Sequence, residues 1–135
     1  MTRYVDLAEY LWLAEQVTGI EAAVLGKASR TDLAESALHA PAAGFGNDDF
    51  YPDPFDKAAV LTCRLAWNHP LPDGNKRAAW ASQVMFIDLN DGRWDPDPPD
   101  VDEGEAAMLA VAAGELTESQ FAAWLRARVI FDEPT

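Results

Sequence analysis

A nine-residue stretch, HPLPDGNKR at positions 69–77, contains the residue types that phosphate chemistry needs. Lys76 and Arg77 stand side by side where the apolar pattern that follows predicts the first turn of a helix. A helix N-terminus has a partial positive charge and unpartnered backbone N–H groups, so each cation there costs about 0.3–1 kcal/mol. A bound anion removes this conflict, and phosphate is the natural candidate.

Four neighbours of this pair could extend an anion site into a reaction site. Gly74 would let the backbone approach a phosphate closely, and Asn75 can hold the turn by side-chain hydrogen bonds to nearby main chain. Asp73 offers the hard carboxylate oxygen that Mg²⁺ on nucleotide phosphates requires. His69 carries an imidazole, which suits proton abstraction from a hydroxyl nucleophile. The stretch therefore predicts a phosphoryl-transfer site.

Each of these residues also has an ordinary structural interpretation. Asp-Gly-Asn is a common turn, a histidine before a proline is often a capping or turn residue, and Lys76 and Arg77 could project into solvent. These explanations would have to coincide over nine residues between two strongly apolar segments. We therefore favour the functional interpretation.

Length and charge restrict the classes of function. A chain of 135 residues predicts one domain with its own core. Its net charge of −13 argues against nucleic acid and against an anionic membrane, and leaves open a basic protein partner or no large partner. Cys63 is the only cysteine and we interpret it as an inert core residue. The absence of a secretion signal or a long apolar run predicts a cytoplasmic protein with no membrane partner.

Start and stop signals predict about six helices and no sheet. Capping-box pairs stand at Asp6 with Glu9 and at Thr117 with Gln120, and Asp53 before Pro54 reads as a cap and first helical position. The expected helices are 7–18, ended by Gly19; one capped by Thr31 or Asp32 and ended by Pro41; 54–68; 76–89, stopped by Asn90 to Gly92; one capped by Asp100 and ended by Gly114; and one that follows Thr117.

The segments between and after these helices complete the prediction. Residues 41–53 form a turn-rich loop that is long for a plain connector, and such loops are often functional. The helix 54–68 is apolar almost all round and should be central and buried. Residues 130–135 are expected to be a loose tail. The sequence therefore predicts a compact, single-domain, all-α fold, with 69–77 between two central buried helices.

At residues 69–77 the sequence resembles the Fic/Doc superfamily, and more closely its Doc (death-on-curing) toxin branch, whose motif reads H-P-F-x-D/E-G-N-G/K-R. The resemblance extends to DLAESALHAP, FYPDPFDKAA and AAGELTESQFAAWL, and so covers most of the chain. It implies a single Fic/Doc domain over residues 1–135.

The resemblance also implies roles for individual residues. His69 would deprotonate a hydroxyl of a target protein, and Asp73 would bind Mg²⁺. Phe50 and Tyr51 would belong to a flap, residues 41–53, that aligns the target segment beside the nucleotide. The phosphates of ATP would be anchored by four consecutive residues: Gly74, Asn75, Lys76 and Arg77.

One position separates two reactions. Most Fic enzymes have glycine where this chain has Lys76 and transfer AMP, whereas the Doc branch has lysine and transfers the γ-phosphate. The second arginine of AMP-transferring members is replaced by Ala81, and Leu71 replaces the motif phenylalanine as an apolar anchor. The resemblance therefore implies a kinase toxin whose target is a translation factor, elongation factor Tu.

No complete inhibitory motif of the S/T-x-x-x-E-G/N kind is present, since TDLAES at 31–36 ends in Ser36. A separate small antitoxin is therefore implied. Two alternatives stay open at this point. One is AMP transfer from ATP to a protein hydroxyl, and the other is a catalytically silent helical module that binds a partner protein.

Overall fold

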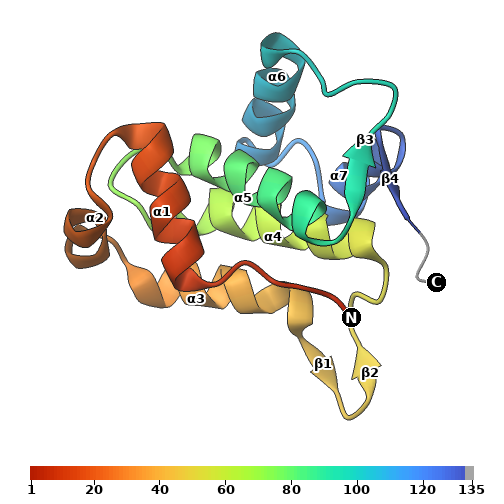
Figure 1. Cartoon of the computed structure of the whole chain (residues 1–135), viewed down its shortest axis with the longest axis horizontal. Coiled ribbons are helices and arrows are strands. Elements are labelled where there is room, and N and C mark those ends of the chain that lie inside the picture. The colour runs from red at the N-terminus through yellow and green to blue at the C-terminus, as the bar shows by residue number, and fades with distance from the viewer. Residues whose placement is uncertain (133–135) are drawn as a thin grey trace.

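The computed structural model describes residues 1–132 and is mainly helical (Figure 1). Seven α-helices lie in this part of the chain: α1 Leu7–Thr18, α2 Ala22–Ala28, α3 Thr31–His39, α4 Pro54–Asn68, α5 Asn75–Leu89, α6 Val101–Ala112 and α7 Glu118–Arg126. Short elements accompany them: the 3₁₀ turn η1 Ala40–Ala42 and the strands β1 Gly44–Phe45, β2 Asp48–Asp49, β3 Gly92–Trp94 and β4 Val129–Phe131.

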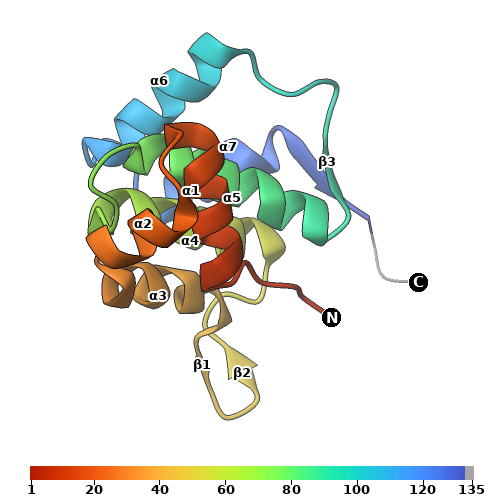
Figure 2. The same ribbon diagram turned by 60° about the vertical axis from the view of Figure 1, so that its left-hand side comes forward.

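The helices α4 and α5 form the centre of one helical body (Figures 1 and 2). Helix α4 packs against α3, α5, α6 and α7, and α1 covers α5. The predicted all-α single domain, with the 69–77 stretch between two central helices, is confirmed. No helix among residues 1–132 is long and apolar enough to cross a membrane.

The predicted capping signals form as expected. The Asp6 carboxylate accepts a 2.8 Å hydrogen bond from the Glu9 N–H at the start of α1, and Glu9 returns a bond to the Asp6 N–H. Thr117 and Gln120 make the same reciprocal pair at the start of α7. These local bonds satisfy orphan donors of the first helical turn, which is why the sequence alone predicts these starts.

Three features differ from the sequence prediction. Helix α2 was not predicted, because its seven residues have no side-chain cap to mark its start. Helix α3 begins after Arg30, so Thr31 is already helical and does not cap it. Residues 130–135 were expected to be loose, but Ile130 and Phe131 belong to β4, which pairs antiparallel with β3. Residues 133–135 lie outside the described part of the chain.

An aromatic cluster joins α5, β3 and α7. Trp80 stacks on Trp94 with 5.8 Å between ring centroids, and Trp124 meets both rings edge-on. Phe121 stacks on Trp124 at 5.4 Å. These large rings bury much apolar area. They hold the first half of α5, which follows the 69–77 stretch, against β3 and α7.

Candidate active site

The connection between α4 and α5 is tightly built. Helix α4 ends because His69 takes a left-handed backbone conformation with φ 48°, which is uncommon for a residue other than glycine. The Pro70 carbonyl accepts a 2.8 Å bond from the Arg30 N–H, which ties the loop to the start of α3. The Leu71 side chain is buried in the core, as expected for the apolar anchor of the loop.

Asn75 holds this loop with its side chain. Its Oδ1 accepts from the Leu71 N–H at 2.9 Å, and its Nδ2 donates to the Leu71 carbonyl at 3.0 Å. The predicted bonds from Asn75 to the nearby main chain are therefore confirmed. The Asn75 amide is buried, and these two bonds hold the shape of the loop.

The same amide faces the histidine ring, since Nδ2 of Asn75 lies 3.3 Å from Nδ1 of His69. The two Leu71 bonds fix which end of the amide carries hydrogen, so His69 Nδ1 is the acceptor here. In the neutral ring the proton then resides on Nε2. The His69 residue is exposed to solvent, so the ring is accessible at the surface of the loop.

Gly74 is required by two features of its surroundings. Its φ of 77° is left-handed, and a Cβ at this position would lie 2.7 Å from Thr18 Cγ2 in α1. Gly74 precedes α5 and provides no side-chain cap. The N–H groups of Asn75, Lys76 and Arg77 have no hydrogen-bond partner among residues 1–132, so three donors converge at this helix start.

The two cations at the start of α5 have different surroundings. Arg77 Nη1 donates a 2.9 Å bond to the Val17 carbonyl in the last turn of α1, and its Nη2 lies 4.0 Å from Asp73 Oδ2. The negative end of the α1 dipole therefore compensates part of the Arg77 charge without a ligand. Lys76 is exposed and makes no ion pair or hydrogen bond among the described residues. The electrostatic conflict inferred from the sequence thus rests on Lys76.

Asp73 is the carboxylate of the loop that could hold a metal ion. Its side chain is 82 % exposed and, within the described part of the chain, makes only the long contact with Arg77. Among residues 1–132 no group of three or more His, Cys, Asp or Glu side chains is placed to hold a metal ion by itself. A single free carboxylate fits Mg²⁺ that arrives with nucleotide phosphates, because Mg²⁺ usually combines one or two carboxylates with phosphate and water oxygens.

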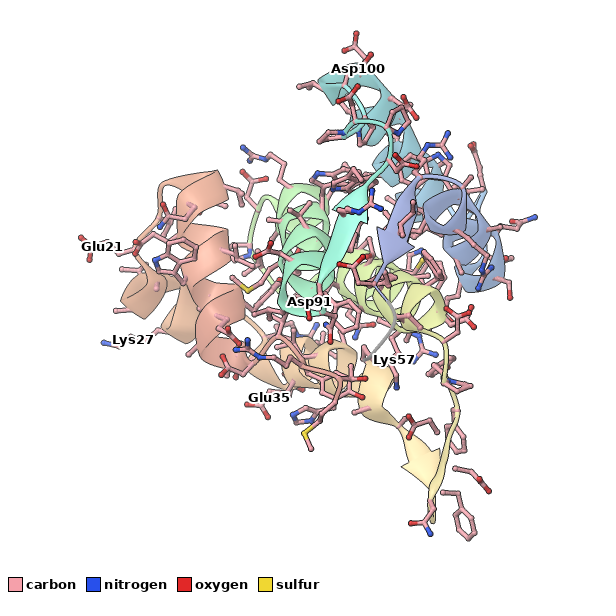
Figure 3. The ribbon with its side chains drawn as sticks, turned by 45° about the vertical axis from the view of Figure 1, so that its right-hand side comes forward. Glu21, Lys27, Glu35, Lys57, Asp91 and Asp100 are labelled. Atoms are coloured by element: carbon pink, nitrogen blue, oxygen red, sulfur yellow. The ribbon has the colours of Figure 1, made fainter. Side chains whose placement is uncertain are left out.

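A cleft of about 690 Å³ extends from Lys76 and Arg77 along α5 toward α6. Its walls are mainly apolar, with Asp100 and Glu105 among the lining residues; Figure 3 labels Asp100 just before α6 begins. The remaining lining residues come from α1, α5, the segment before α6 and α6: Val17, Trp80, Ala81, Pro99, Val101, Gly104, Met108 and Leu109. The volume is in the range of small-molecule sites.

Sequence reasoning singled out only part of this cleft. Trp80 and Ala81 follow Lys76 and Arg77 by four residues and so share their helix face, a signal that the sequence contains. The α6 wall, with Gly104 opposite the Trp80 ring, depends on how α6 packs and has no such signal.

Phe50 and Tyr51 make no hydrogen bond or ion pair with this loop among the described residues. They follow the β1–β2 hairpin, which adjoins the start of α4, whereas His69 follows its end (Figure 1). A 15-residue helix spans about 22 Å. The Tyr51 hydroxyl nevertheless lies 3.4 Å from Arg64 Nη2, in the second half of α4, so the length of the helix does not set its distance from His69. The structure brings together His69 and residues 73–77. The predicted role of Phe50 and Tyr51 in a flap stays a prediction.

The chain is an all-α domain in which the loop 69–77 connects the two central helices, α4 and α5. Comparison with known sequences identifies the family that shares this loop. The family model described as Fic/DOC family matches residues 4–87, so the chain belongs to this family. Over 125 residues the chain is 37% identical to Toxin Doc of Mycolicibacterium smegmatis (strain ATCC 700084 / mc(2)155). That match covers 93% of this chain and 92% of the relative.

Proposed function

We propose that this chain is a Doc-like toxin that transfers a phosphoryl group from Mg-ATP to a serine or threonine hydroxyl of a protein. The observation that carries the proposal is the uncapped start of α5, where three N–H groups and the adjacent Lys76 ammonium group have no partner among residues 1–132. This start opens into a cleft of nucleotide size. A triphosphate would satisfy the donors and the cation together.

In the proposed reaction His69 takes the proton of the target hydroxyl. The hydroxyl oxygen forms a bond to the γ-phosphorus, the bond from this phosphorus to the β–γ bridging oxygen breaks, and ADP leaves with that electron pair. Lys76 and the first N–H groups of α5 stabilise the phosphate charge. Asp73 would hold Mg²⁺, and the ion would supply further neutralisation of this charge.

The contact between Asn75 and His69 sets a requirement for this step. With Nδ1 accepting from Asn75, the neutral ring has its proton on Nε2, so Nδ1 is the nitrogen that is free to take the hydroxyl proton. The ring then becomes an imidazolium, and the contact with the Asn75 N–H must break first. The 3.3 Å separation is longer than an ordinary N–H hydrogen bond, so little free energy is needed to break this contact. We infer that target binding releases His69 from Asn75.

Two observations favour phosphoryl over AMP transfer in this proposal. Lys76 occupies the position that is glycine in AMP-transferring members, and it is the cation of the pair without a partner among the described residues. Ala81, which replaces their second arginine, lines the cleft, so the cleft wall has no guanidinium group there.

The proposed target is a translation factor, elongation factor Tu, whose modification would stop translation and growth. The support is the Doc-type motif together with the relative named Toxin Doc. A separate small antitoxin is proposed because the chain has no complete inhibitory motif of its own. A cytoplasmic location would follow from such a target.

The test is incubation of the protein with elongation factor Tu and Mg-ATP labelled at either the γ- or the α-phosphate. Label from the γ-phosphate on the factor, lost in His69→Ala, would support the proposal. Label from the α-phosphate would select AMP transfer. No label from either position, with no binding of Mg-ATP to the wild-type protein, would select the silent binding module.

A further inference from the structure

The Lys57 side chain is a buried charge that the proposed reaction does not use. It lies in the first turn of α4, where Figure 3 labels it. The residue is only 2 % exposed. Its Nζ donates to the Pro41 carbonyl at 3.0 Å and to Asp49 Oδ2 at 3.2 Å, and it lies 5.5 Å from the centroid of the Tyr4 ring. Three separate segments therefore meet at one ammonium group, which keeps its charge buried at low cost.

The β1–β2 hairpin, residues 44–49, has no apolar anchor of its own. Every residue from Gly44 to Phe50 is exposed, with Phe45 at 83% and Phe50 at 62%. Each strand contains two residues, and a two-stranded hairpin is at best marginally stable in water. Burial of apolar side chains therefore does not hold the hairpin against the helices.

Few other contacts could attach it. The Phe50 N–H bonds to the Ala43 carbonyl at 3.0 Å, which closes the hairpin on itself but does not join it to a helix. Arg64 Nη2 reaches the Tyr51 hydroxyl only at 3.4 Å, just after the hairpin. Among residues 1–132, the bond from Lys57 to Asp49 is the one side-chain link that joins a strand of the hairpin to the helical body.

We propose that Lys57 is the anchor of this hairpin and that the hairpin opens as a unit, without unfolding of the helices, when Asp49 releases the ammonium group. In the closed state Lys57 is inaccessible, and the exposed rings of Phe45 and Phe50 are held in place with the hairpin. In the open state Lys57 reaches solvent and the two rings lose their fixed orientation. The inference does not depend on the proposed reaction.

Amine acetylation tests the proposal, because the other two lysines, Lys27 and Lys76, are exposed and give an internal reference rate. Acetylation by an N-hydroxysuccinimide ester is followed residue by residue by mass spectrometry. Lys57 should react slowly in the wild type, and at least about tenfold faster in Asp49→Asn, since the ion pair is lost and a neutral amide oxygen is a weaker acceptor than a carboxylate. Asp48→Asn, the matched exposed neighbour, should leave the Lys57 rate unchanged.

A second measurement covers the anchor residue itself. In Lys57→Met the amides of residues 43–50 should exchange hydrogen for deuterium at least about tenfold faster, while exchange in α5 stays as in the wild type. Lys27→Met is the control and should alter neither region. An unchanged Lys57 acetylation rate in Asp49→Asn would overturn the proposal. So would exchange in Lys57→Met that rises equally in the hairpin and in α5, because the hairpin would then open only with global unfolding.

Discussion

Replacement of Lys76 by methionine should change stability and ligand binding in opposite directions. Lys76 is exposed at the uncapped, electropositive start of α5 and has no acidic partner among the described residues. Methionine has a similar helix propensity and no charge. Without ligand, the free energy of unfolding should therefore rise by about 0.3–1 kcal/mol.

With ligand, the same replacement should weaken binding. A hydrogen bond between charged groups contributes about 1.5–3 kcal/mol, so Lys76→Met should bind Mg-ATP roughly ten- to a hundredfold less tightly. Urea denaturation with and without Mg-ATP measures both effects in one assay, because a ligand that binds only the folded state raises the apparent stability.

Lys27→Met is the matched control for this experiment. Lys27 is also exposed and its replacement changes the net charge by the same amount, but it lies in the last turn of α2, where a cation is favourable. This variant should be slightly less stable and should bind Mg-ATP normally. If Lys76→Met were no more stable than the wild type, or bound Mg-ATP equally well, the argument that this cation is placed for a phosphate would be refuted.

Three further predictions concern the loop and the core. Asn75→Ala should lower the free energy of unfolding in urea by about 1–3 kcal/mol, because it leaves the Leu71 N–H and carbonyl without partners. Gly74→Ala should cost at least about 1–2 kcal/mol, since the left-handed backbone disfavours alanine and the new Cβ would meet Thr18; thermal denaturation would measure the loss. Burial raises the pKa of the Cys63 thiol from 9.0 to about 12, so the unfolded chain releases this proton first. Stability should therefore fall as the pH rises from about 9 to about 12, and a pH series of urea titrations should show a shallower fall in Cys63→Ala.

In the 69–77 loop, contacts between residues close in sequence were predictable and a contact with a distant segment was not. The bonds of Asn75 to Leu71 span four residues, and Gly74 and Leu71 act in the turn itself, so local reasoning anticipated them. The bond from Arg77 to the Val17 carbonyl spans 60 residues and was not anticipated. This bond compensates part of the Arg77 charge within the protein. Lys76 is then the cation of the pair that has no partner among the described residues and could bind a ligand.

The strands β3 and β4 and the helix α2 were not predicted, because they too lack a local sequence signal. The strands β3 and β4 contain only three residues each, too few for an alternation of apolar and polar residues to mark them, and their partners lie 35 to 39 positions apart in sequence. Helix α2 is short and has no side-chain cap. The position of the β1–β2 hairpin, which adjoins the start of α4 while His69 follows its end, depends on how this helix separates its two flanking loops.

By itself, the sequence determined the helical class, most helix starts and the composition of the 69–77 loop, because capping bonds, helical periodicity and turn geometry act over a few residues. The tertiary structure decided which donors stay free at the start of α5, which residues form the cleft and what holds the hairpin. These properties arise from contacts between distant segments, and only the packing of the helices brings those segments together.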